Sequence, residues 1–348
     1  MIHRLILLGL ACWLLAAAPA HAAQAVIALP QGREVVDMRW LDRDTLVLVE
    51  REAGELQISL VDAGGAELME MELPRSLERA GGDPELFRLA LSPLGNSLAV
   101  VERNASLLSA SRLSAYRISR EEISAVSTYR MPMEFWPDKL CWDEAGNNLF
   151  MSMRPYLQTK QKSSLGMFRM ADSSFVALLE REKLDLVEQL AFLPGSGELA
   201  VLCSAYEGAY PRNPMLVLVN PAGNRTRVVH ADASQGRLQL LDNGDLLLRT
   251  EAGRSSTWMM HAGDDSLQLL EGKGLPAWDC QVSRDGSWLA GMSGKGLLLQ
   301  DADASTAYDS GIASALFRFN FDGSRLAVLE EGNAMLHLME PGNIVLDD

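Results

Sequence analysis

Two segments of the sequence gather side chains that could bind an anion or a protein partner. The first, RPYLQTKQKSS (residues 154–164), places cationic and aromatic groups together in a chain that is acidic overall. Its candidate binding residues are Arg154, Tyr156, Lys160 and Lys162. Guanidinium and ammonium groups donate charge-assisted hydrogen bonds to carboxylates and phosphates. We therefore expect this segment to bind an acidic partner, or a ligand that carries a carboxylate or phosphate group.

The second segment, SAYEGAYPRNP (residues 204–214), is rich in residue types that anchor protein contacts. Its candidate binding residues are Tyr206, Glu207, Tyr210 and Arg212. Tyrosine and arginine are enriched at the energetic centres of interfaces, because they bury much area at modest entropic cost. The alternative is that both segments are solvated loops whose tyrosines pack on the body of the protein.

Few other residues suggest catalysis. The sequence contains no G-x-S-x-G, H-E-x-x-H, P-loop or dinucleotide-binding motif. Beyond residue 22 the histidines are His230, His261 and His337, which lie outside both segments. A histidine base beside a nucleophile is therefore not expected. We predict no catalytic residues, no metal ligands and no cofactor.

A repeated pattern predicts the elements that position the two segments. The phrases LSPLGNSLAVVE (91–102), VSRDGSWLAGMS (282–293) and FNFDGSRLAVLE (319–330) resemble one another. An apolar residue follows the turn in seven such units: Leu46, Leu98, Leu149, Leu199, Leu246, Leu289 and Leu326. Each unit has a β-prone run, a turn rich in Asp, Asn and Gly, and then a nearly all-apolar run. Continuous hydrophobicity over a short run indicates a strand that is covered on both faces.

The motif x-S-x-D-G-x-x-L-A, clearest at 282–290 and 319–327, resembles the WD40-like repeat in the propeller of TolB and its periplasmic relatives. This resemblance implies a β-propeller, in which each blade lies between two others. Seven units then predict an all-β fold, a seven-bladed β-propeller of four-stranded antiparallel blades that forms a single domain over residues 23–348. Proteins of the TolB type carry an additional N-terminal α/β domain, for which no room is left before the first blade. The resemblance therefore covers the propeller alone.

The last unit shows only three clear strands of its own. The early run 24–29 could supply the missing outer strand of blade 7 and so close the fold without an open sheet edge. The C-terminal NIVLDD could fill the same role.

Connection lengths predict which side of the propeller carries function. The D-G turns are uniformly tight, whereas the opposite side carries long connections early in the chain, at 74–85, 103–110, 132–137, 154–165 and 204–214. The matching later connections, 293–296 and 330–333, are short. Long loops on a rigid scaffold are usually functional. We expect a protein partner to dock on the long-loop face of blades 2–4.

The N-terminus and the overall charge restrict location and partners. Residues 1–22 combine a basic start, an apolar run over 5–18 and the small-x-small sequence Ala20-His21-Ala22, which is the pattern of a cleaved signal peptide. No later run approaches the 18 or so apolar residues of a membrane span, so we expect a periplasmic protein without a transmembrane segment. The formal net charge of −15 disfavours binding to nucleic acid.

The three cysteines beyond the leader, Cys141, Cys203 and Cys280, form no C-x-x-C pair. Each lies in an apolar run and is expected in the core, while a disulfide between two of them stays open.

We therefore expect a non-catalytic periplasmic propeller that acts as a protein-binding or scaffold module in a cell-envelope or secreted complex. The alternative is an enzyme, either a propeller subunit of a periplasmic dehydrogenase or a propeller hydrolase or lactonase that uses carboxylates and a metal. It would require polar side chains to converge from the innermost strands. Those strands and their flanks offer Asp37, Arg39, Arg88, Asp138, Asp279 and Arg318, a mixed set without an evident ligand cluster.

Overall fold

The computed structural model of this chain describes most of the sequence beyond the predicted leader. The described residues are 23–74, 84–104, 111–131, 135–155, 163–178, 184, 186–204, 206–207, 210–211, 215–222, 225–230, 236–250, 256–269, 280–292, 296–301, 307–332 and 335–343. The predicted signal peptide, the C-terminal residues 344–348 and the candidate residues Tyr156, Lys160, Lys162, Arg212 and Asp279 lie outside these ranges.

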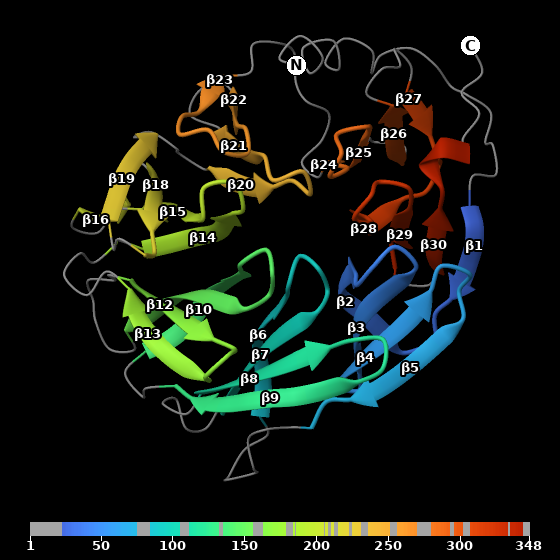
Figure 1. Cartoon of the computed structure of the whole chain (residues 1–348), viewed down its shortest axis with the longest axis horizontal. Coiled ribbons are helices and arrows are strands. Elements are labelled where there is room, and N and C mark those ends of the chain that lie inside the picture. The colour runs from blue at the N-terminus through green and yellow to red at the C-terminus, as the bar shows by residue number, and fades with distance from the viewer. Residues whose placement is uncertain are drawn as a thin grey trace. The chain divides into compact units, whose positions relative to one another are not determined.

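The chain is an all-β seven-bladed propeller in which each blade is a four-stranded antiparallel sheet (Figure 1). This confirms the fold class predicted from the repeat. In the described residues no α-helix is present, and one 3-10 turn, η1, follows the last strand. Its bounds are Pro341–Asn343.

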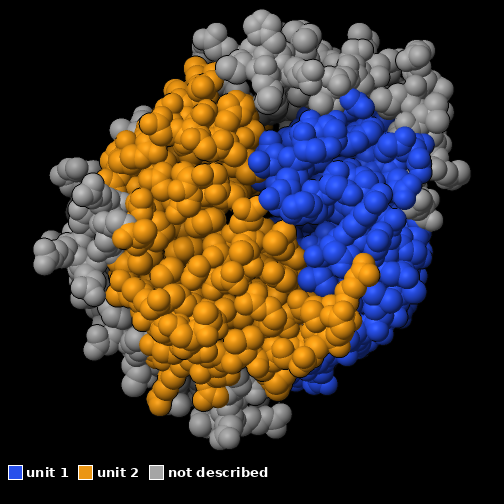
Figure 2. All heavy atoms as spheres, in the orientation of Figure 1, with its two compact units in different colours: residues 1–73, 241–243, 270–348 blue, residues 74–240, 244–269 orange. Residues whose placement is uncertain are grey.

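The blades belong to two compact units, which Figure 2 colours separately. Unit 1 comprises residues 1–73, 241–243 and 270–348, and it holds blades 1, 6 and 7. Blade 1 consists of β2 (Arg33–Trp40), β3 (Thr45–Glu52), β4 (Glu55–Asp62) and β5 (Glu67–Glu72). Blade 6 consists of β24 (Cys280–Val282), β25 (Trp288–Met292), β26 (Leu297–Asp301) and β27 (Ala307–Asp309). Blade 7 consists of β28 (Ser314–Phe319), β29 (Leu326–Glu330), β30 (Met335–Met339) and β1 (Ala23–Ala28).

Unit 2 comprises residues 74–240 and 244–269, and it holds blades 2 to 5. Blade 2 consists of β6 (Pro84–Leu91), β7 (Ser97–Asn104), β8 (Ser111–Ile118) and β9 (Ile123–Arg130). Blade 3 consists of β10 (Phe135–Trp142), β11 (Asn148–Pro155), β12 (Ser164–Arg169) and β13 (Ser174–Leu178). Blade 4 consists of β14 (Leu186–Leu193), β15 (Glu198–Ser204), β18 (Met215–Asn220) and β19 (Arg225–His230), and β16 (Tyr206–Glu207) and β17 (Tyr210–Pro211) form a separate small sheet. Blade 5 consists of β20 (Arg237–Leu240), β21 (Leu246–Thr250), β22 (Ser256–Met260) and β23 (Gln268–Leu269).

The N-terminal strand β1 supplies the outer strand of blade 7. It pairs antiparallel with β30, and Ala28 lies opposite Met335. Of the two closures that the sequence left open, the early strand is therefore the one observed. The pairing leaves β30 with a neighbour on both sides, so that its backbone groups join a continuous ladder.

The second strand of each blade forms the core, as its continuous hydrophobicity predicted. In β3 the four consecutive residues Leu46, Val47, Leu48 and Val49 are at most 2% exposed. Leu46 and Leu48 pack with Ala327 of blade 7 in one cluster of buried side chains. A strand that is buried on both faces has no solvent side, which explains why its sequence does not alternate.

The D-G turns require glycine for two reasons. Gly146 and Gly323 have φ values of +69° and +72°, a conformation that favours glycine. A Cβ on Gly146 would also lie 2.9 Å from the Ser97 hydroxyl of blade 2, and one on Gly323 would lie 2.9 Å from an oxygen of Asp285 in blade 6. These two turns therefore pack closely against the preceding blade, so that here the repeated phrase serves the packing of neighbouring blades.

A tryptophan at the end of the innermost strand repeats this link between blades. Trp40 of β2 donates its indole N–H to the carbonyl of Arg318 at 3.0 Å, and Trp142 of β10 donates to the carbonyl of Ala90 at 2.9 Å. In each case the acceptor lies in the innermost strand of the preceding blade within the same unit. The indole thus satisfies its donor while its ring is buried.

The three cysteines within the described residues, Cys141, Cys203 and Cys280, are free thiols. Cys203 and Cys280 are buried, as predicted, and Cys141 is partly exposed and packs against the core cluster of blades 3 and 4. Burial raises the pKa of the Cys141 thiol well above its usual range, so the group stays protonated and unreactive.

Candidate functional site

A recurring β-bulge in the innermost strands determines where one key carboxylate points. The register with the second strand slips at one residue in five blades: Val36, Phe87, Asp138, Glu188 and Ala315. A bulge leaves its extra residue out of the ladder and re-aims the side chain. In blade 3 that residue is Asp138, and the amide of the next residue, Lys139, donates to the Ser152 hydroxyl at 3.1 Å. The fold therefore places a carboxylate at a defined kink.

Asp138 lies between two arginines of unit 2. Its side chain is only 8% exposed. Arg88 of β6 donates from Nη2 to Oδ1 at 2.7 Å and from Nε to the main-chain carbonyl of Asp138 at 2.6 Å. Arg154 of β11 forms an ion pair on the other side, with its Nε 2.9 Å from Oδ2. We call these three residues the Arg88–Asp138–Arg154 cluster.

The cluster carries a net positive charge, because two guanidiniums share one carboxylate. The side chains of Arg88 and Arg154 are 39% and 35% exposed. Each guanidinium has five N–H donors in a planar fork that suits carboxylates and phosphates. The buried Asp138 therefore fixes two solvent-accessible cations in a chain whose formal net charge is −15. This arrangement can bind an anion.

Along the chain, the predicted binding residues belong to the connections that follow the second strands of blades 3 and 4. Arg154 is the penultimate residue of β11, at the end of the strand where the predicted segment 154–164 begins. In blade 4 the equivalent connection, between β15 and β18, contains the β16–β17 hairpin, where Tyr206 pairs with Pro211 and Glu207 with Tyr210. The backbone of these three candidate residues is described, and their side chains lie outside the description.

The structure joins residues that the sequence assigned to different hypotheses. Arg154 was expected in a docking segment, whereas Arg88 and Asp138 were expected to line the inside of the propeller. Arg88 and Asp138 are 50 residues apart in the chain, and adjacent blades bring them into contact. The sequence indicated these residues because they are charged and lie within otherwise apolar innermost strands. It did not indicate which of them would contact each other.

A second group of charged residues lies in unit 1. Arg39 Nη1 is 3.7 Å from Oδ1 of Asp242, which belongs to the turn residues 241–243. Burial raises the pKa of the Asp242 carboxyl, and the charges of Arg39 and Arg318 oppose that effect. Asp37, expected in the same set, accepts a hydrogen bond from the amide of Met38 at 2.8 Å.

The described residues contain no group of three His, Cys, Asp or Glu side chains that could hold a metal ion. Nor does any helix within the described ranges have the length and hydrophobicity needed to cross a membrane.

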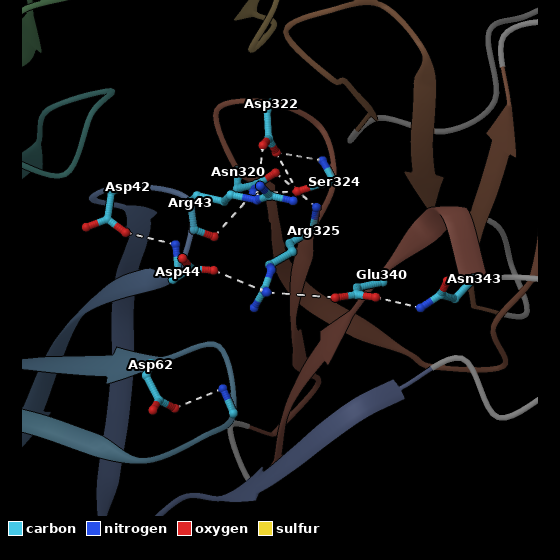
Figure 3. Close-up of polar contacts among 11 residues, drawn as sticks. Asp42, Arg43, Asp44, Asp62, Asn320, Asp322, Ser324, Arg325, Glu340 and Asn343 are labelled. Atoms are coloured by element: carbon cyan, nitrogen blue, oxygen red, sulfur yellow. Dashed lines mark hydrogen bonds and ion pairs between the residues drawn. The ribbon is translucent and has the colours of Figure 1, made fainter.

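The D-G side of unit 1 is held by its own ion pairs, which Figure 3 shows. Arg325 contacts Asp44 at 3.1 Å and Glu340 at 3.8 Å, so its charge is matched inside the network. One feature was not expected on this side: Phe321, in the turn of blade 7, is 54% exposed, and the guanidinium of Arg284 lies 4.0 Å from its ring centroid. This stack gives the turn a cation–π contact.

Comparison with known proteins supports the fold alone. No family model matches the chain, and no curated protein matches its sequence. Among solved structures, an oligogalacturonate lyase in complex with manganese has 14% identity and a TM-score of 0.59, over 85% of this chain and 86% of that one. The β-propeller domain of the Trilobed protease from Pyrococcus furiosus has 12% identity and a TM-score of 0.55, over 90% and 96%. The Pyrococcus horikoshii acylaminoacyl peptidase has 10% identity and a TM-score of 0.57, over 86% of this chain and 49% of that one. At such identities the chain shares the β-propeller architecture of these proteins, and nothing more specific follows.

Proposed function

We propose that this chain is a non-catalytic, periplasmic binding propeller that captures an acidic segment of a protein partner at the Arg88–Asp138–Arg154 cluster. The observation that carries the proposal is the pairing of two exposed guanidiniums with one buried carboxylate. Such a pair offers charge-assisted hydrogen bonds without first having to be ordered, because Asp138 already fixes both side chains. The acidic remainder of the chain repels anions, so this cluster would select where they bind.

The neighbouring connections would complete the docking surface. The candidate residues Tyr156, Lys160, Lys162, Tyr206, Tyr210 and Arg212 belong to the connections that leave the same end of blades 3 and 4. Tyrosine side chains would supply the apolar area that an ionic contact lacks. A role in a cell-envelope complex, like that of the TolB-type propellers which the repeat resembles, is consistent with the predicted signal peptide and belongs to the same proposal.

The proposal is tested by capture with the full chain. The wild type and the variants Arg154→Gln and Tyr210→Ala would be used to recover partners from envelope extract. The matched control is Arg169→Gln, since Arg169 is an exposed arginine of the same blade at the opposite end of the strands, where it pairs with Asp172 at 3.9 Å. We expect Arg169→Gln to recover the partner as the wild type does and Arg154→Gln to recover at least about tenfold less, in line with loss of one charged hydrogen bond.

Two further readouts belong to this experiment. Recovery by the wild type should fall as salt rises from about 0.05 to 0.5 M, because ion pairs are screened. The chain recovered from a periplasmic fraction should begin near residue 23. Equal recovery by wild type, Arg154→Gln and Tyr210→Ala would remove this surface as the docking site, and a chain retained in the cytoplasm would contradict the location.

A further inference from the structure

Two innermost strands of unit 1 present arginines to one aspartate. Arg39 is the penultimate residue of β2, and Arg318 is the penultimate residue of β28. Asp242 Oδ1 lies 3.7 Å from Arg39 Nη1, and the charge of Arg318 also acts on its carboxyl group. The backbone N–H of Phe319 also faces this carboxyl group and favours its ionised form. The three side chains together carry one net positive charge.

Arg39 and Asp242 form no hydrogen bond with each other. The 3.7 Å separation of Arg39 Nη1 and Asp242 Oδ1 is longer than a hydrogen bond. Arg39 Nε and Asp242 Oδ2 are both buried atoms, and neither has a hydrogen-bond partner within the described ranges. Buried polar atoms in folded proteins are nearly always hydrogen-bonded. The cluster therefore holds one buried donor, Arg39 Nε, and one buried acceptor, Asp242 Oδ2, that are not hydrogen-bonded.

Access to the cluster is partial rather than closed. The side chains of Arg39 and Asp242 are 24% and 22% exposed, so solvent reaches the groups whose inner atoms are buried. Burial raises the pKa of the Asp242 carboxyl above its ordinary value of 3.8. A hydrogen-bond donor that reaches such a carboxylate stabilises its ionised form, because water hydrates the group only in part.

We propose that Arg39, Asp242 and Arg318 form a binding site for a small oxyanion that also carries a hydroxyl group. The anionic oxygens would accept hydrogen bonds from the two guanidiniums, including Arg39 Nε. The hydroxyl group would donate to Asp242 Oδ2, whose negative charge would otherwise face the anion. A hydroxycarboxylate and hydrogen phosphate share this combination of groups. The site is separate from the Arg88–Asp138–Arg154 cluster, where both carboxylate oxygens already contact arginines.

Isothermal titration of the full chain with malate and succinate tests the proposal directly, because these two dicarboxylates differ by a single hydroxyl group. We expect malate to bind at least about tenfold more tightly than succinate, the effect of one hydrogen bond to a charged group. Inorganic phosphate forms a third arm of the experiment. Saturable phosphate binding that depends on Arg39 would support the site and assign phosphate as the source of the oxyanion.

Variants then connect binding to the named side chains. Arg39→Gln should weaken binding of the preferred ligand at least about tenfold, whereas Arg325→Gln, which removes the same charge from the same unit, should leave it unchanged. Asp242→Asn should bring the affinities for malate and succinate together, since the neutral amide no longer repels an anion that lacks a hydroxyl group. The proposal is overturned if malate and succinate both bind the wild type with the same measurable affinity, if Arg39→Gln binds the preferred ligand like Arg325→Gln, or if neither malate nor phosphate saturates the protein at millimolar concentration. The comparison of ligands on the wild type needs no variant to fold.

Discussion

The two compact units each place an aspartate against two arginines, but they hold it in different ways. In unit 2 Asp138 is part of a strand, and its bulge directs the carboxylate to two guanidiniums at 2.7 and 2.9 Å. In unit 1 Asp242 is carried by a turn, and Arg39 Nη1 lies 3.7 Å from its Oδ1. A carboxylate built into a sheet shares the rigid frame of its partners, whereas one on a turn is positioned by a separate segment.

This difference indicates that the Arg88–Asp138–Arg154 cluster holds its two arginines in place, whereas the cluster around Asp242 leaves hydrogen bonds that a ligand could make. Asp138 contacts Arg88 at 2.7 Å and Arg154 at 2.9 Å and holds both side chains in place, while each guanidinium keeps part of its surface exposed to solvent. Asp242 is buried without full compensation, as its raised pKa indicates. The first cluster suits recognition by its arginines, and the second suits a ligand that completes the hydrogen bonding of its aspartate.

The largest loss of stability should come from removing the Asp138 carboxylate. Asp138→Ala should lower the free energy of unfolding by about 2–3 kcal/mol, because it removes the buried carboxylate that contacts both guanidiniums. Denaturant unfolding measures this change. The control is Glu34→Ala, which breaks the exposed pair with Arg51 and should cost less than about 1 kcal/mol. Equal losses in the two variants would show that Asp138 contributes no more than a surface residue.

The next largest loss of stability should be the same in the two units. Trp142→Phe and Trp40→Phe each remove the indole donor and leave a carbonyl of the preceding blade without its bond. Each substitution should lower the free energy of unfolding by about 1–2 kcal/mol, and the two values should agree within about 0.5 kcal/mol. Thermal and denaturant unfolding provide the measurement. A large loss in one unit alone would mean that the link between blades is not equivalent in both.

The comparison predicts opposite signs for one conservative change. Asp138→Asn should destabilise the protein at pH 7, whereas Asp242→Asn should leave it equally stable or more stable by about 1 kcal/mol or less. The folded chain raises the pKa of Asp242 above the value of 3.8 that applies when unfolded. Its contribution to stability is therefore complete below pH 3.8, is lost as pH rises through the folded pKa, and is constant above it.

Unfolding curves of wild type and Asp242→Asn, measured across this range of pH, provide the check. The free energy of unfolding of the wild type relative to the variant should decline as pH rises. A relative stability that instead rises with pH would mean that the arginines, rather than burial, dominate at Asp242.

The smallest effect is expected for the polar network on the D-G side. Arg325→Gln loses its pair with Asp44, whose side chain is 53% exposed, and should change the free energy of unfolding by less than about 1 kcal/mol. The same denaturant assay applies, repeated at 0.5 M salt, where the difference should shrink further. A loss as large as that of Asp138→Ala would remove the distinction between a network on turns and a carboxylate fixed in a strand.

The sequence by itself determined the architecture of the blades. Turns such as Asp322-Gly323 specify a left-handed backbone position, and runs such as Leu46–Val49 can only be strands covered on both faces. Both signals are local, so they repeat visibly along the chain.

Only the tertiary structure decided which charged side chains meet. Arg154 was a candidate from its segment alone, yet its contact with Asp138 depends on a bulge in a different strand. Asp242 was not singled out from the sequence at all, because its turn resembles the other turns of the repeat. Ion pairs depend on distances between strands that are far apart in the chain, and no local pattern of residues encodes those distances. The repeat thus specifies the blades, while their packing selects the two places where binding is proposed.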